Sequence, residues 1–384
     1  MASKSFKNII SYVKEEMRTF KEKPFNDVDS LVLSQLSYTH FNGIVDEGGE
    51  WIKLHQALKA ECFEGMFKNV LSGDKTKKLL FAMCASPRFR EVELGFYREI
   101  TNHNTEQQFA SISFKLPFNA IYIAFRGTDS TVVGWKEDFN MAFMRVVPSQ
   151  EKAVAQVNTV AGGSKLPIII GGHSKGGNLA LYGAAYCNKD AQERITAVYN
   201  HDGPGFRKEI LQGEGFKRIL PLIKKTVPEF SLIGMLLYHK AEYRAVQSGE
   251  KLIMQHDPFS WIVKGGDFAY AEDISDNAIL IDEAISQWLD EVDDESREKF
   301  VDVLFDVISA SGLNSFNEFE EDKFNNAKAM LDAIKGIDGE TKKFVFKISS
   351  LLASLSVKNA AKSTRQKLLA ENKDKIGDRN GYFS

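Results

Sequence analysis

The chain has 384 residues, 43% of them hydrophobic and 26% charged, which is typical of a soluble globular protein with a sizeable core. Its 49 Lys and Arg residues nearly balance its 52 Asp and Glu residues, so the composition argues against a nucleic acid partner. The length exceeds one typical domain and suits one large domain with an appendage.

Cysteine usage and the N-terminal sequence indicate the compartment. Cys62, Cys84 and Cys187 are far apart in the sequence and form no metal-binding pattern, which suits a reducing interior. The N-terminus carries charges throughout, unlike a signal peptide, and no apolar run approaches the roughly 18 residues of a membrane-spanning helix. We therefore expect a cytoplasmic protein.

Helical patterns dominate the N-terminal part, and strands follow. Residues 1–24 predict an amphipathic helix, and a second helix follows at 31–41 behind a capping segment at 27–30. A charged stretch at 50–75 is also predicted to be helical. Next come a strand and turn at about 89–99 and two paired strands at 108–114 and 120–126.

The central part alternates strands with helices. Strands are predicted at 167–171, 195–200 and 242–248, with helices at 177–187 and 206–240 between them. This alternation favours a largely parallel α/β sheet. In such sheets the functional groups gather at the carboxyl ends of the strands.

From about residue 275 the pattern becomes purely helical. Four helices are predicted, with breaks at glycines near 312 and 336–339, and the polar residues 373–384 are expected to be disordered. We expect three parts: a domain over 1–275, a helical C-terminal extension over 276–372, and the tail at 373–384.

The most informative segment is Leu166–Ala180, LPIIIGGHSKGGNLA. An apolar strand ends in two glycines, and Ser174 follows at the centre of G-x-S-x-G, between Gly172 and Gly176, before a helix. This strand–turn–helix context presents a nucleophilic serine, and the glycines allow strand and helix to approach closely. The alternative is a turn with a purely structural role.

A nucleophilic serine needs a general base. Of the seven histidines, only His239 and His256 follow both the serine and a plausible acid, as the order Ser, acid, His requires. His239 lies in an apolar segment that favours a packing role. His256 precedes a proline-containing turn, so we expect it to be the base, with a loop-capping histidine as the alternative.

Three carboxylates are candidates for the acid that orients this histidine. Asp202 ends the strand after the serine strand, where its carboxylate can reach an imidazole at the edge of the sheet. Glu250 lies one strand later, and Asp257 adjoins His256, from which its side chain is expected to diverge. We expect Asp202 to be the acid and retain Glu250 as the alternative.

The oxyanion of an acyl transfer reaction needs two hydrogen-bond donors. The backbone N–H of Lys175, directly after the serine, supplies one. Thr128, in the turn after the strand at 120–126, is the candidate for the second. Arg126 is expected to hold this loop by pairing with a carboxylate, for which Asp138 is a reasonable partner.

Several motifs together resemble a known family. The segments FRGTDSTVVGWKEDF, GGHSKGGNLA and QHDPFSW are similar to the FRGT, serine-elbow and histidine segments of fungal-type class 3 lipases. With NHDGPGF added, the set resembles the bacterial Mbeg1-like family of α/β-hydrolases more closely. The resemblance covers roughly residues 25–275.

This resemblance implies an α/β-hydrolase fold with a mostly parallel central sheet, a helical N-terminal segment and the helical C-terminal extension. It also implies hydrolysis of an ester or lipid without a metal or other cofactor, with Ser174 as nucleophile and His256 as base. Thr128 and Lys175 would be the oxyanion donors. One departure concerns the acid: where those lipases carry Asn-Asp, this chain has Ser248-Gly249-Glu250.

The expected substrate is a small acyl ester. A cation on Lys175 would favour a lysophospholipid or another anionic ester, and residues 130–143 match the lipase lid by position. The apolar stretch 230–238 is a second candidate border of an acyl pocket. Residues 341–361 are the best candidate for peripheral membrane contact, against packing on the hydrolase domain. The competing hypothesis is a hydrolase-fold binding or regulatory protein with little or no turnover, which acts through its helical C-terminus.

Overall fold

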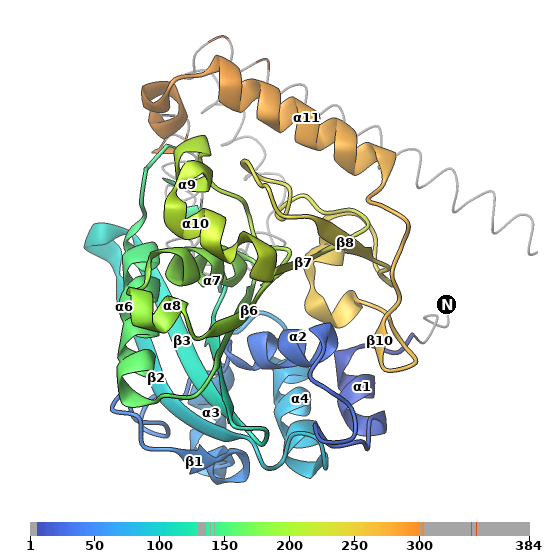
Figure 1. The fold of residues 1–384 in the computed structure, drawn as a ribbon. Helices are drawn as coiled ribbons and strands as arrows, with labels where there is room; N and C mark the ends of the chain where they lie inside the picture. Colours follow the sequence, from blue (N-terminus) through green and yellow to red (C-terminus); the bar gives the residue numbers. More distant parts are fainter. Residues whose placement is uncertain are drawn as a thin grey trace, which may run out of the picture.

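A computed structural model of the chain describes residues 6–129, 136–138, 140–141, 143–299 and 301–302, and the isolated residues 339 and 343. Its centre is an eight-stranded sheet in which spatial order follows chain order (Figure 1). The strands are β1 (Ile52–Lys53), β2 (Glu93–Asn102), β3 (Gln107–Leu116), β4 (Ala120–Phe125), β5 (Ile168–His173), β6 (Ile195–His201), β7 (Ile223–Pro228) and β8 (Tyr243–Val246). Strands β1 to β4 pair antiparallel, and β4 to β8 pair parallel.

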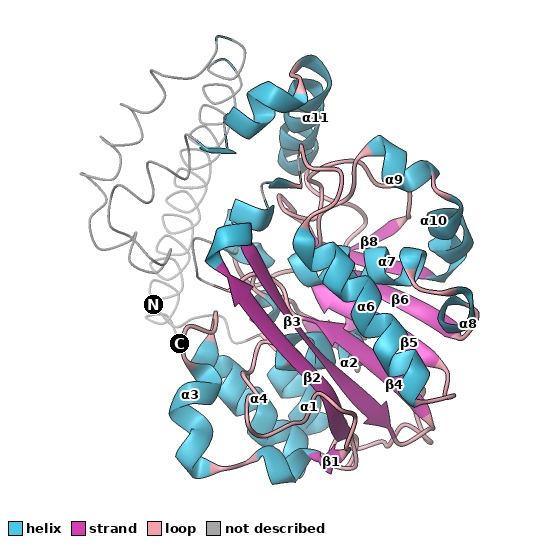
Figure 2. Ribbon diagram, turned by 90° about the vertical axis from the view of Figure 1, so that its left-hand side faces the viewer, coloured by secondary structure: helices cyan, strands magenta, loops and turns pink. Residues whose placement is uncertain are grey.

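Helices cover both faces of this sheet (Figures 1 and 2). One face packs against α1 (Ile9–Glu15), α2 (Asp27–Leu36) and α4 (Gly73–Ala85), with α3 (Phe63–Phe67) beside α4. The other face packs against α6 (Pro148–Gly163), α7 (Lys175–Tyr186), α8 (Lys189–Gln192), α9 (Lys208–Gln212) and α10 (Glu214–Ile219). Because both faces are covered, β4 and β5 are buried along their whole length, and both are rich in apolar residues.

Shorter elements complete the described fold. A small hairpin of β9 (Val263–Lys264) and β10 (Asp267–Phe268) follows the main sheet. The 3-10 turns are η1 (Leu54–Ala57), η2 (Ala60–Cys62), η3 (His103–Thr105), η4 (Leu220–Leu222), η5 (Leu252–His256) and η6 (Pro258–Ser260). The mostly parallel sheet between helical layers confirms the predicted α/β-hydrolase class.

Three of the helix predictions need correction. The first helix spans only Ile9–Glu15, within the predicted 1–24. The segment 50–75 holds β1, short 3-10 turns and α3 rather than one helix. The predicted helical region at 206–240 is interrupted by β7, because Lys224 and Lys225 obscure the apolar pattern of a buried strand.

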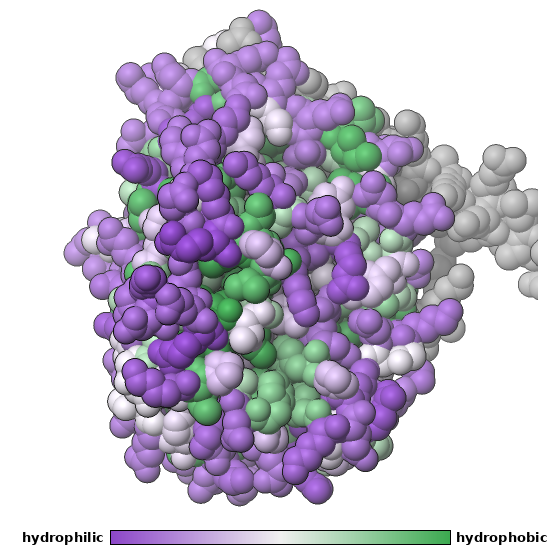
Figure 3. Space-filling view, viewed as in Figure 1, coloured by the Kyte–Doolittle hydropathy of each residue, from purple (hydrophilic) through white to green (hydrophobic). Residues whose placement is uncertain are grey.

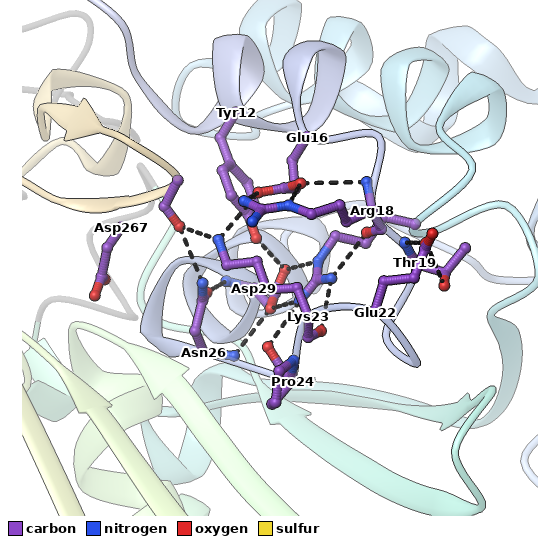
Figure 4. Close-up of polar contacts among 12 residues, drawn as sticks. Tyr12, Glu16, Arg18, Thr19, Glu22, Lys23, Pro24, Asn26, Asp29 and Asp267 are labelled. Atoms are coloured by element: carbon purple, nitrogen blue, oxygen red, sulfur yellow. Dashed lines mark hydrogen bonds and ion pairs between the residues drawn. The ribbon is translucent and has the colours of Figure 1, made fainter.

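Asp29 lies among polar side chains of the N-terminal segment (Figure 4), and its buried ion pair with Arg88 joins this segment to the turn after α4. Arg88 donates to both carboxylate oxygens of Asp29, at 2.7 Å and 2.5 Å, and both side chains are fully buried. Asp29 also accepts from the Tyr12 hydroxyl at 2.8 Å and completes a capping box with Asn26 at the start of α2. Arg88 donates further to the backbone carbonyls of Arg18, Lys23 and Pro24.

The predicted C-terminal extension is described only at its start. Helix α11 (Asp276–Glu291) begins where the extension was expected, and its apolar side packs on Val227, Phe230 and Met235. The further helices predicted up to 372, the tail at 373–384 and the membrane candidate at 341–361 lie outside the described ranges, apart from two single residues.

The outer surface is largely hydrophilic on the side that Figure 3 shows, with apolar side chains gathered in small areas. No helix within the described ranges is both long and apolar enough to cross a membrane.

Candidate active site

The predicted serine turn lies at the centre of the sheet. Ser174 follows β5 directly and precedes the first residue of α7, with φ +58° and ψ −135°, a backbone conformation that L-residues rarely adopt. A Cβ at Gly172 would lie 2.2 Å from the Gly176 carbonyl carbon, and one at Gly176 would lie 2.1 Å from the Phe125 carbonyl oxygen. Only glycine fits at either position, so the two flanking residues of the motif are required by the turn itself.

Three of the predicted site residues meet here. The His256 Nε2 atom lies 3.0 Å from Ser174 Oγ, and its Nδ1 atom lies 2.6 Å from Asp202 Oδ2. The other carboxylate oxygen of Asp202 accepts a hydrogen bond from the Ser231 hydroxyl. An imidazole held between a hydroxyl and a carboxylate can take the hydroxyl proton and carry the resulting charge beside the acid.

The alternative acids lie elsewhere. Glu250 is exposed, and its backbone is hydrogen-bonded: its N–H donates to Ser248 Oγ, and its carbonyl accepts from Gln255. Asp257 pairs with Lys75 at 2.8 Å, away from the imidazole, as expected for neighbouring side chains. The other candidate histidine, His239, is largely buried, and burial lowers its pKa to about 4.

A second histidine, His173, supports the position of His256. Its Nε2 lies 2.9 Å from the His256 carbonyl oxygen, and its Nδ1 lies 3.1 Å from the Tyr38 hydroxyl. The rings of His173 and His256 lie against each other, with centroids 4.6 Å apart. Burial, and then the nearby His256, lower the pKa of His173 well below its usual range, so it is neutral. Its place in the serine motif is the sequence signal that could have identified it.

The loop after β4 passes directly against the serine. A Cβ on Gly127 would lie 2.5 Å from the His173 carbonyl oxygen and 3.0 Å from Ser174 Cβ. Thr128 is buried, and its hydroxyl donates to Asp138. Because this bond uses the hydroxyl proton, the donor that Thr128 retains for an oxyanion is its backbone N–H. The N–H of Lys175, at the first position of α7, has no acceptor within the helix.

The Lys175 side chain is buried rather than presented to a substrate. Its Nζ atom lies 3.0 Å from Glu137 Oε2 and 3.7 Å from Asp138 Oδ1, and the side chain has no exposed surface. Glu137 also accepts from the backbone N–H of Gln108 and from the N–H and hydroxyl of Ser149. The prediction that Lys175 attracts an anionic ester is therefore wrong, because two internal carboxylates already neutralise its charge.

The predicted partner of Arg126 is also wrong. Arg126 Nη1 lies 2.6 Å from Glu99 Oε1, and His40 approaches the same carboxylate at 2.8 Å. The Arg126 N–H donates to the Ala110 carbonyl, and Ala110 pairs with Glu99 across β2 and β3. Cross-strand pairing therefore places Glu99 beside Arg126, whereas Asp138 accepts the hydrogen bond of the Thr128 hydroxyl.

The predicted acyl-pocket segments are only partly described. Within the lid candidate 130–143, residues 130–135, 139 and 142 lie outside the described ranges, and Met141 is buried. The segment 230–238 is a loop, not a helix, and Phe230 and Met235 pack in the same cluster as α11.

The model of the Mbeg1-like family matches residues 83–306, more than half of the chain. Among curated proteins, none matches this sequence.

Solved structures that resemble the chain include three lipases. The Rhizomucor miehei lipase propeptide complex is 15% identical with a TM-score of 0.35, covering 64% of this chain and 72% of that one. M37 lipase is 14% identical with a TM-score of 0.36, covering 55% and 70%. The lipase from Rhizopus microsporus var. chinensis is 12% identical with a TM-score of 0.34, covering 61% and 87%.

Proposed function

This chain belongs to the Mbeg1-like family, and from that premise we propose that it is a serine hydrolase that cleaves an acyl ester through an acyl-serine intermediate. The observation that supports this most directly is the His256 imidazole, which lies between Ser174 Oγ and the Asp202 carboxylate.

In the proposed reaction, His256 Nε2 takes the Ser174 proton as the serine oxygen attacks the ester carbonyl. The carbonyl oxygen becomes an oxyanion, which the backbone N–H groups of Thr128 and Lys175 stabilise. His256 then gives its proton to the leaving alcohol. Water, activated by the same imidazole, hydrolyses the acyl-serine and restores the free hydroxyl.

The substrate is proposed at the level of an acyl ester, including lipids such as lysophospholipids. The buried Lys175 removes the reason for preferring an anionic head group, because its charge is paired inside the protein. A panel of p-nitrophenyl esters of increasing chain length, followed by neutral and anionic lysolipids, addresses acyl length and head group separately.

A fluorophosphonate probe tests the nucleophile. At equal concentrations of folded protein, we expect the wild type to be labelled and Ser174→Ala to remain unlabelled, because the probe reacts with an activated serine. Mass spectrometry of the labelled peptide would place the adduct on Ser174. Folded wild-type protein that resists the probe would instead support a binding or regulatory role.

The same probe distinguishes the two acids. Asp202→Asn is expected to slow labelling and ester turnover by about 10⁴-fold, since the imidazole loses the carboxylate that fixes its tautomer. Glu250→Gln is the matched control and should leave both rates unchanged, because the Glu250 side chain is exposed. Near-normal turnover in Asp202→Asn would remove Asp202 from the mechanism.

Two features favour the competing hypothesis of an inactive hydrolase fold: the missing Asn-Asp element and the long helical C-terminus predicted from the sequence. Asp202, at a different strand end, lies 2.6 Å from His256 Nδ1, which supports the enzyme on the first point. The predicted C-terminal helices lie mostly outside the described residues, so the second point stays open.

A further inference from the structure

Strand β7 carries two successive lysines in opposite environments. Lys224 is exposed, with its Nζ atom 3.2 Å from the Tyr199 hydroxyl, whereas Lys225 is only 3% exposed. In the sheet Lys225 pairs with Asn200, and the next residue, Thr226, accepts from the Asp202 N–H at 2.8 Å. Lys225 therefore lies beside the strand end that presents the proposed catalytic acid.

One turn contacts both Lys225 and Asp202. The Lys225 ammonium donates to the Gly234 carbonyl at 2.5 Å, and the Ser231 hydroxyl donates to Asp202 Oδ1. A Cβ on Gly234 would lie 2.2 Å from the same Oδ1 atom and 2.7 Å from Ser231 Oγ. The turn 231–234 thus lies tightly against the carboxylate, and Lys225 fixes its far end.

Burying the charged ammonium group of Lys225 costs desolvation free energy. Burial lowers its pKa to about 8, although the negative charges of Asp202 and of Asp282 on α11 oppose this shift. Other titratable neighbours are His239, whose pKa the lysine helps to lower, and Tyr243, its partner across β7 and β8. A methionine of similar length would avoid the desolvation of an ammonium, which costs several kcal/mol. Packing alone therefore gives no reason for a lysine here.

We propose that Lys225 is a positioning residue for the acid of the triad. By holding the Gly234 carbonyl, it fixes the turn whose Ser231 hydroxyl keeps the Asp202 carboxylate oriented toward His256. Its positive charge also interacts favourably with the negative charge of that carboxylate. This inference rests on the proposed function, because it assigns Lys225 a part in the same reaction.

The test compares three variants of the full chain: Lys225→Met, Lys225→Gln and, as matched control, Lys224→Met on the same strand. Thermal unfolding first establishes that each variant is folded. The rate of fluorophosphonate labelling at Ser174 and the kcat and KM for p-nitrophenyl butyrate are then measured across pH.

We expect Lys225→Met to reduce labelling rate and kcat by about tenfold or more, with KM within about twofold of wild type. Lys225→Gln, which keeps an N–H donor for Gly234, should recover part of that loss. The acidic limb of the pH–rate profile should move to higher pH in both, because removal of a cation favours the protonated imidazole. Lys224→Met should behave as wild type.

Labelling of Lys225→Met at the rate of Lys224→Met would overturn the proposal. So would a loss in which kcat and KM change together and the pH profile does not move, since that describes a general structural defect. If Lys225→Met does not fold, the Lys225→Gln profile decides by the same criteria. Absence of Ser174 labelling in the wild type would count against the serine hydrolase itself, which separates the two failures.

Discussion

Asp138 connects the loop after β4 to the serine turn, since it accepts from the Thr128 hydroxyl and lies 3.7 Å from the Lys175 ammonium. Burial raises its pKa to about 6, and Lys175 and Thr128 offset only part of that effect. A carboxyl with this property binds its proton more tightly in the folded chain than in the unfolded one.

This shift predicts the sign of a pH effect on stability. Between the unfolded pKa of about 3.9 and the folded value, the folded chain binds more protons, so Asp138 lowers the free energy of unfolding as pH rises through this window. The full effect is at most about 3 kcal/mol. Asp138→Asn removes it, so the melting temperature of the variant relative to wild type should rise between pH 4 and pH 7.

The control for this series is Glu272→Gln, since Glu272 is exposed and its removal should give a constant offset. Melting temperatures from circular dichroism at four pH values are sufficient. A difference between Asp138→Asn and wild type that stays flat, or that grows toward acid pH, would contradict the assignment.

For individual residues, the sequence was sufficient where the position of a side chain depends on a local motif or on chain order. Ser174 lies in its own motif, and His256 and Asp202 follow from the order of the strand ends. The partners of Arg126 and the burial of Lys175 could not be predicted, because Glu99 reaches Arg126 through cross-strand pairing and Glu137 reaches Lys175 from a separate segment. The catalytic roles themselves remain predictions.

Among the elements, α2 depends most on a buried charge. Its first turn contains Asp29, to which Arg88 donates from Nε and Nη2. Tyr12 of α1 donates to the same carboxylate (Figure 4). Arg88→Met should lower the free energy of unfolding by about 3–5 kcal/mol, because it leaves a buried carboxylate without its cation. Urea denaturation followed by tryptophan fluorescence measures this loss.

Arg90→Met is the matched control for that measurement. Arg90 is two residues away and exposed, and its ion pair with Glu91 is 3.8 Å long and solvent-exposed. Such surface pairs contribute about 0–1 kcal/mol. Equal effects of the two substitutions would show that the Asp29 network does not stabilise this layer.

Helices and strands were predicted correctly where a single hydrophobic pattern runs through the whole element. Strands β4 and β5 are apolar along their length, and both were predicted within one or two residues. Strand β7 was missed because its two lysines interrupt the apolar run, one exposed and one buried for a reason unrelated to packing. A local sequence pattern does not distinguish those two environments.

For the molecule as a whole, the N-terminal helices and the sheet share one core. Ile9, Val13, Leu31 and Leu36 of α1 and α2 are fully buried in the cluster that includes sheet residues such as Phe114. The family match begins at residue 83 and leaves these helices out. A fragment of residues 83–306 would expose this side of the sheet.

We therefore expect the 83–306 fragment to be aggregated or unfolded, whereas a fragment of residues 1–306 should unfold cooperatively. Size-exclusion chromatography and urea unfolding of the two fragments beside the full chain make the comparison. Cooperative unfolding of 83–306 alone would mean that α1 and α2 are accessories to an independent domain.

The residues at the end of β5 determine where this fold tolerates insertions and deletions. Three consecutive residues there have separate tasks: His173 supports the loop of His256, Ser174 presents its hydroxyl, and Lys175 offers a backbone N–H while its side chain reaches Glu137. A one-residue insertion or deletion in β5 would put a different residue at each of these three positions, and the new residue could not make the same contacts. It would also turn each side chain of the strand to the opposite face of the sheet. Changes in length among relatives should therefore fall in the connecting loops, with this tripeptide held at a fixed distance from the strand's start.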